Sequence, residues 1–196
     1  WLPLTIGITF AMLMWIWRKG RFYLGKEMSA NSISVADLVE LRNSNSLTID
    51  KSVGLYISAQ SEQIPQALQE QIRILKHMPE QVVIVTIKPV DVPYANSDPK
   101  FTRVNDFLSR VVIENGFMES RNIPEVLRSE VLKQHFEEEK ATYFLTTRTM
   151  VRNRDVGLNT REELIFTALH RNAAKASLYF KLPAKRVMTF DVKHDV

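Results

Sequence analysis

The sequence contains no cysteine and only six glycines among its 196 residues. The absence of cysteine excludes disulfide scaffolds, cysteine-ligated zinc, iron–sulfur clusters and a cysteine nucleophile. The low glycine content leaves few positions for phosphate-cradling loops, and no GxSxG, GxGxxG or GxxxxGK[ST] motif occurs. This composition fits a protein of a reducing compartment.

Charge is also missing from the first part of the chain. No charged residue precedes Arg18, and the stretch before it is apolar apart from two threonines. Lys19, Arg21 and Lys26 follow, and these four cations equal the formal net charge of +4. The rest of the chain is therefore neutral. A nucleic-acid partner is not expected, because it would require a basic surface spread over the folded domain.

The apolar stretch and its basic flank predict a transmembrane helix over residues 1–22. Its apolar part, Trp1 to Trp17, would span roughly 26 Å, slightly less than the ~30 Å hydrocarbon core. The chain begins at Trp rather than Met, so we expect a truncated span. Trp15, Trp17, Arg18, Lys19 and Arg21 are typical of a membrane interface, and positive charges mark the cytoplasmic side. Residues after about 21 are therefore expected in the cytoplasm. The alternative is a buried helix of a soluble domain.

The remaining residues predict a juxtamembrane linker over 23–50 and a cytoplasmic α/β domain over 51–196. Within the linker, residues 25–32 read as a loop, and Ser34 is the expected N-cap of a short amphipathic helix over 34–42. The domain is expected to hold a mostly parallel sheet with flanking helices, because strands and helices alternate and residues 82–87 form a β-branched run without alternation. Strands are predicted at 53–58, 81–88, 101–104, 108–114, 142–147 and 186–192, and helices at 65–75, at 124–136 and from Thr160 onward.

Helical spacing identifies the inward faces of two of these helices. The predicted core positions are Leu68, Ile72 and Leu75 on the first, and Leu127, Val131, Leu132 and Phe136 on the second. The charge run from Glu137 to Glu139 is interpreted as a solvated helix end or loop.

The sequence supplies no catalytic constellation, so an enzyme is not expected. The four histidines are isolated, no metal-ligand spacing occurs, and Asp91 and Asp98 fit solvated turns. Two polar groupings are candidates for binding an anion or a nucleotide. Thr147 and Arg148 end a predicted strand, where open α/β sheets place ligands. Arg171 and Asn172 lie on a predicted helix beside small residues. The alternatives are ordinary loop basicity for the first grouping, and packing or partner contact for the second.

Several segments, taken in order, resemble the C-terminal end of a Kup-type potassium uptake permease, from its last membrane span through its cytoplasmic domain. The matching segments are residues 17–21, 53–57, 64–68, 82–86, 115–119, 122–124, 142–145, 171–174 and 179–187. The resemblance covers nearly the whole chain. The chain departs from the family at residues 71–74, where the family often carries Asn-Leu-Lys-His, and at residues 151–161.

The resemblance implies a multi-pass protein of the cell membrane, or of the inner membrane in a Gram-negative cell, that takes up K⁺ by symport with H⁺. Its partners would be the lipid bilayer, the remaining transmembrane helices and a second copy in a homodimer. No cofactor is expected, and the K⁺ and H⁺ sites would lie outside this fragment. The cytoplasmic domain would support assembly or regulation. One alternative is a nucleotide-sensing regulatory domain, and another is a membrane-tethered enzyme.

Overall fold

The computed structural model describes residues 1–30, 33–44, 46–58, 60, 62–95, 97–119, 122–151, 165 and 181–195. These residues belong to two compact units. The first consists of residues 1–31, 148–174 and 191–196, and the second of residues 32–147 and 175–190. Most of the predicted helix that begins at Thr160, including Arg171 and Asn172, lies outside the described residues.

The first unit begins with helix α1, which spans Leu2–Ala30. Apolar side chains along its first half are exposed, among them Leu4 at 70% and Phe10 at 62%. The prediction of a loop from residue 25 is wrong as far as Ala30, because α1 continues past Gly25. Lys26, Glu27 and Met28 are good helix formers. Among the described residues, no helix has the length and apolarity that crossing a membrane requires.

Helix α2, Val35–Asn43, begins as the sequence predicts. The backbone N–H of Asp37 donates to the Ser34 hydroxyl at 3.1 Å, and the N–H of Ser34 donates to the Asp37 carboxylate at 3.1 Å. This reciprocal cap satisfies two N–H groups that a helix start otherwise leaves unpaired. Leu38 is fully buried and anchors α2 on the core.

After α2 the chain forms a sheet, which has six strands in the order β3-β4-β2-β1-β5-β6 within the described residues. The strands are β1 Thr48–Ser58, β2 His77–Val90, β3 Lys100–Arg103, β4 Leu108–Gly116, β5 Ala141–Val151 and β6 Val187–Asp195. β1 pairs in parallel with β2 and β5, β2 pairs in parallel with β4, and β3 is antiparallel to β4. The prediction of a mostly parallel α/β sheet is confirmed.

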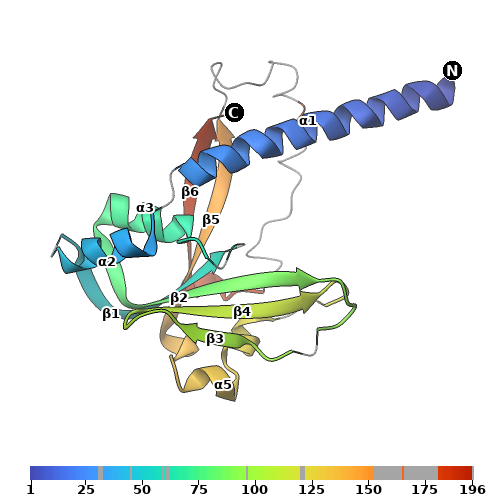
Figure 1. Cartoon of the computed structure of the whole chain (residues 1–196). Helices are drawn as coiled ribbons and strands as arrows, with labels where there is room; N and C mark the ends of the chain where they lie inside the picture. Colours follow the sequence, from blue (N-terminus) through green and yellow to red (C-terminus); the bar gives the residue numbers. More distant parts are fainter. Residues whose placement is uncertain are drawn as a thin grey trace. The chain divides into compact units, whose positions relative to one another are not determined.

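The connections cover both faces of the sheet. Helix α3, Gln66–Leu75, connects β1 to β2 on the face that also carries α2. The short helices α4, Ile123–Leu127, and α5, Glu130–Lys133, connect β4 toward β5 on the opposite face. Figure 1 shows α2 and α3 on one side of the strands and α5 on the other. From β1 the chain adds β2 and β4 on one side, then returns to place β5 on the other side of β1, which is a doubly wound order.

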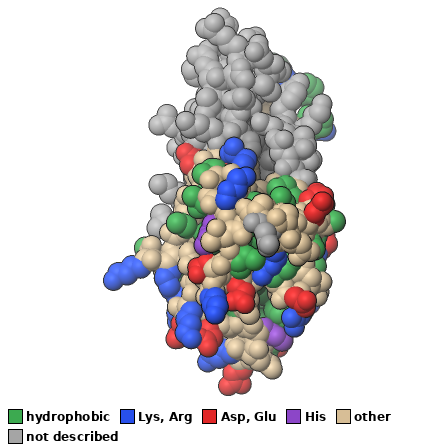
Figure 2. All heavy atoms as spheres, turned by 90° about the vertical axis from the view of Figure 1, so that its left-hand side faces the viewer, with side chains coloured by type: hydrophobic (Ala, Val, Ile, Leu, Met, Phe, Trp, Pro, Cys, Tyr) green, Lys and Arg blue, Asp and Glu red, His purple; other side chains and the backbone are tan. Residues whose placement is uncertain are grey.

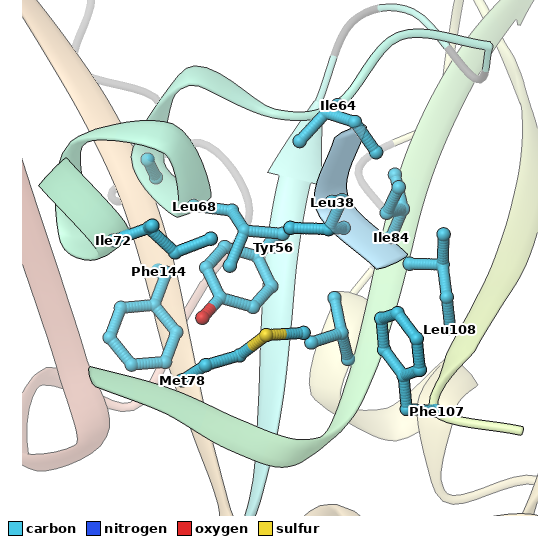
Figure 3. Packing of buried hydrophobic residues seen from close by; sticks show 12 residues of the cluster. Leu38, Tyr56, Ile64, Leu68, Ile72, Met78, Ile84, Phe107, Leu108 and Phe144 are labelled. Carbon is cyan, nitrogen blue, oxygen red and sulfur yellow. The ribbon is translucent and has the colours of Figure 1, made fainter. Parts of the chain in front are cut away.

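The core under α3 is built around Tyr56 of β1. Figure 3 shows its ring among Leu68, Phe144 and Met78. Leu68 and Ile72 of α3 are buried, as their spacing predicts. The prediction for Leu75 is wrong, because α3 ends there and the left-handed backbone of Lys76 turns the chain away, which leaves Leu75 50% exposed.

The opposite face departs from the prediction of one helix over 124–136. The helix is interrupted at Arg128 and Ser129, so that α4 and α5 are separate short helices. Leu127 and Leu132 both face the sheet and are fully buried. Val131 points away and is 44% exposed, because the break changes the helical phase of α5. Phe136 is buried, as expected.

Candidate functional site: a buried glutamate between two arginines

The candidate ligand residues are not brought together within the described part of the chain. Thr147 is exposed on β5, and Arg148 follows it in the same strand. The order of the sheet reverses between β1 and β5, so Thr147 lies on a strand at the switch point, where open α/β sheets place ligands. Arg171 and Asn172 lie outside the described residues.

The candidate membrane-interface residues all lie on α1. Trp15 is 68% and Trp17 is 37% exposed, and Arg18 is exposed whereas Lys19 is half-buried. Arg21 lies on the same helix, one turn beyond Trp17.

A group of charged side chains that the sequence reasoning missed surrounds Glu138. This residue begins the 3₁₀ helix η1, Glu138–Lys140, and its side chain is only 1% exposed. Nε of Arg128 donates to its Oε2 at 2.7 Å, and Nη2 of Arg186 donates to its Oε1 at 2.9 Å. The hydroxyl of Tyr143 donates to the same Oε1. The interpretation of the charge run as a solvated end is therefore wrong for Glu138, while Glu137 and Glu139 are exposed.

Arg186 also binds the backbone. It lies in the 3₁₀ helix η2, Ala184–Arg186, and its Nη1 donates to the carbonyl oxygens of Glu138 at 2.6 Å and Glu139 at 3.0 Å. A third, longer contact of 3.4 Å reaches the carbonyl of Ala141. The planar guanidinium suits such a task because its donors lie in a fixed fork. One side chain thus provides hydrogen bonds for backbone carbonyl groups in η1 and at the start of β5.

The electrostatics of the cluster keep Glu138 ionised. Burial alone would raise the pKa of Glu138, but the hydrogen bonds from Tyr143 and Arg128 and the charge of Arg186 outweigh burial and hold the pKa below its usual value. Burial, with the hydrogen bond to Glu138, raises the pKa of the Tyr143 hydroxyl. The hydrogen bond to Glu138 likewise raises the pKa of Arg128.

This arrangement stabilises the fold and is unsuited to proton transfer. Glu138 has no proton to donate near neutral pH, and both of its oxygens accept hydrogen bonds. Among the described residues, no group of three or more His, Cys, Asp or Glu side chains could hold a metal ion.

A neutral counterpart lies on the opposite face of the sheet. The hydroxyl of Tyr56 donates to Oε1 of the buried Gln71 at 2.7 Å. The Tyr56 ring stacks on Phe144 with a centroid distance of 4.7 Å, and burial raises the pKa of its hydroxyl. Gln71 belongs to the segment in which the sequence departs from the Kup pattern, and here it serves a packing role.

A hollow of about 400 Å³ opens beside the Glu138 cluster. Its lining residues are Arg128, Lys133, Phe136, Glu137, Glu138, Glu139 and Lys140. Lys140 forms an ion pair with Glu137 at 2.6 Å. The hollow therefore combines cations, carboxylates and one aromatic wall.

No local signal in the sequence marks this cluster. Tyr143 and Arg186 lie in segments that resemble the Kup family, but the partners of Glu138 lie 10, 5 and 48 positions away. Glu138 stands between Phe136, a predicted core residue, and the strand predicted from residue 142, but this position does not indicate its partners.

The fold and this cluster define a doubly wound α/β domain held together by a buried ionic network. Residues 51–194 match the K⁺ potassium transporter C-terminal domain family, and the chain belongs to that family. No solved structure matches the chain.

Three bacterial relatives carry the name "Probable potassium transport system protein Kup". The chain is 30% identical over 193 residues to that of Caulobacter vibrioides, which covers 96% of this chain and 29% of the relative. It is 30% identical over 193 residues to that of Methylococcus capsulatus, covering 96% and 31%. It is 28% identical over 191 residues to that of Erythrobacter litoralis, covering 96% and 30%. The chain thus spans less than a third of the length of these relatives.

Proposed function

We propose that this chain is the C-terminal portion of a K⁺ uptake transporter, in which the α/β domain supports assembly or regulation and does not conduct ions. The observation that carries the proposal is the family match over residues 51–194, together with relatives named as potassium transport proteins along 96% of the chain. The ionised cluster supports it further, because Glu138 and its arginines are used to hold the domain together. Figure 2 shows positive and negative side chains interspersed on the visible face, in keeping with a neutral domain.

The proposal includes the membrane. Residues 1–22 would form the end of the last span of the transporter, with the parent protein completing its length, and the α/β domain would lie in the cytoplasm. The apolar first half of α1 and the change to basic residues at Arg18 support this assignment. Transport would be symport with H⁺, the ion sites would lie in other membrane helices, and the protein would act as a transporter and not as an enzyme.

The test uses the full-length transporter in cells that lack other K⁺ uptake. Deleting residues 51–196 should lower the initial rate of Rb⁺ uptake while an epitope tag shows that the membrane part is still inserted. Glu138→Ala should also lower uptake, whereas Lys51→Gln, a change at an exposed lysine, should not. Normal uptake and normal abundance after the deletion would rule the proposal out.

Topology is tested separately. Single cysteines placed at Met14 and Ser29 in the full-length protein should differ in labelling by a membrane-impermeant maleimide. Ser29 should react only after the cells are opened, and Met14 should not react in either state. Labelling of Ser29 in intact cells would place the domain on the other side.

A nucleotide-sensing role is the second candidate, and one observation favours it. The sheet reverses its order between β1 and β5, and Thr147 lies on β5. Arg148, Arg171 and Asn172 would then contribute to the same ligand. Calorimetry of the chain with adenine mono- and dinucleotides tests this idea, and the absence of heat at millimolar ligand would end it.

A further inference from the structure

The hollow beside Glu138 contains donors that the buried network leaves unused. Nε of Arg128 is bound to Glu138, but neither of its Nη nitrogens has a hydrogen-bond partner among the described residues. The Arg128 side chain is 47% exposed and lines the hollow. Because its Nε is fixed at 2.7 Å from a buried carboxylate, the fork of the two Nη groups is held in place.

A second cation faces the same space. Lys133, the last residue of α5, lines the hollow and forms no ion pair within the part of the chain that the structure describes. Phe136 supplies an apolar wall. A guanidinium fork and an ammonium around one space are the groups that bind phosphate oxygens best.

The carboxylates around the hollow are mostly neutralised. Glu138 lies between Arg128 and Arg186, and Glu137 pairs with Lys140 at 2.6 Å. Glu139 is exposed and forms no ion pair among the described residues, although its charge acts on Arg128. An anion in the hollow would therefore meet two available cations and one opposing charge.

We propose that this hollow binds a phosphate group, with Arg128 and Lys133 as its binding residues. Its volume of about 400 Å³ exceeds that of a bare phosphate ion and lies in the range of small-molecule sites. The group is carried either by a small phosphomonoester or by the headgroup of a phosphomonoester lipid. This site is independent of the transporter proposal, and it lies away from Thr147.

Calorimetry of the purified full chain in detergent micelles tests the proposal with inorganic phosphate and glycerol 3-phosphate as probes. Saturable binding of these soluble probes is expected when the site takes a free phosphomonoester. Lys133→Gln should weaken binding roughly tenfold, because it removes one charge-assisted contact. Glu139→Gln should strengthen binding, because it removes the opposing charge. Lys88→Gln, which removes an equal charge at an exposed position near the other end of the strands, should leave the affinity unchanged.

A second experiment distinguishes the two possible carriers of the phosphate group, a small phosphomonoester and a lipid headgroup. Vesicles of phosphatidylcholine with and without phosphatidic acid are compared for wild type and Lys133→Gln. A preference for phosphatidic acid that Lys133→Gln removes, without binding of glycerol 3-phosphate, identifies the lipid headgroup. The reverse pattern identifies a free phosphomonoester.

Two results would overturn the site. One is the absence of saturable binding by either soluble probe and by phosphatidic acid vesicles. The other is an equal loss of affinity in Lys133→Gln and Lys88→Gln, which would mean only a general effect of charge. Unchanged far-ultraviolet circular dichroism of each variant shows that the fold is retained.

Discussion

The two faces of the sheet each bury a tyrosine whose hydroxyl donates to a side-chain oxygen, but they do so with different chemistry. Under α3, Tyr56 donates to the neutral amide of Gln71. Under α4 and α5, Tyr143 donates to the ionised Glu138, which also binds Arg128 and Arg186. A neutral pair needs only its two members, whereas a buried charge needs every partner in place. The second face should therefore be more sensitive to mutation and to pH.

The largest effect is expected from Glu138→Ala. It removes the carboxylate that the Tyr143 hydroxyl and two guanidinium groups bind, and it leaves a cavity. It should therefore lower the free energy of unfolding by about 3 kcal/mol. Urea unfolding followed by far-ultraviolet circular dichroism measures this. Tryptophan fluorescence is unsuitable, because all three tryptophans precede Arg18 and so report on α1. A loss below that of an ordinary surface substitution would contradict the role of Glu138.

The two tyrosines provide a direct comparison. Tyr143→Phe removes a hydrogen bond to a charged group and should cost about 2 kcal/mol, whereas Tyr56→Phe removes one to a neutral amide and should cost about 1 kcal/mol. Both variants keep the ring and its packing, so the difference isolates the charge. Equal losses in urea unfolding would mean that the ionic partner adds nothing.

The dependence on pH should distinguish the same faces. The folded pKa of Glu138 is lowered, so its stabilisation is complete above the unfolded value of about 4.3 and is lost as the pH falls through the folded pKa. Glu138→Gln should therefore show a smaller loss of stability than wild type below about pH 4.3. The hydrogen bonds with Ser34 also lower the pKa of Asp37, so Asp37 contributes to the loss of stability at low pH. Asp37→Asn is the control that removes this second contribution. The stability of Tyr56→Phe should fall with decreasing pH in parallel with that of wild type.

The smallest effect is expected from Lys133→Gln. Lys133 forms no ion pair within the described residues, so the urea midpoint should stay at the wild-type value while phosphate affinity falls. A clear drop in the midpoint would show that Lys133 belongs to the ionic network and not to the hollow alone.

The parts of the fold that the sequence predicts are those in which neighbours along the chain also determine the structure. The β-branched run over 82–87 became the buried centre of β2, and the Ser34 cap begins α2. The turn between the strands predicted at 101–104 and 108–114 also lies where expected, because the side-chain oxygen of Asn105 accepts from the N–H groups of Phe107 and Leu108 before β4 begins.

The errors share a different origin. Helical periodicity assigned Leu75 and Val131 to the core, but each lies where a helix ends or restarts and its phase is lost. Glu138 was assigned to solvent because its neighbours are charged, and its partners come from other elements. Such long-range pairing leaves no periodic pattern, so it could not be predicted from one sequence.

The contact between Arg186 and Glu138 joins positions that are 48 residues apart. During synthesis, β1, α3, β2 and β4 leave the ribosome in sequence and can pair as they appear. Glu138 follows with Arg128 and Tyr143, and it must wait for its second guanidinium until residue 186 has been made. The buried ionic cluster is thus completed only after residue 186 has been made, whereas the pairing of β1, β2 and β4 needs no later residue.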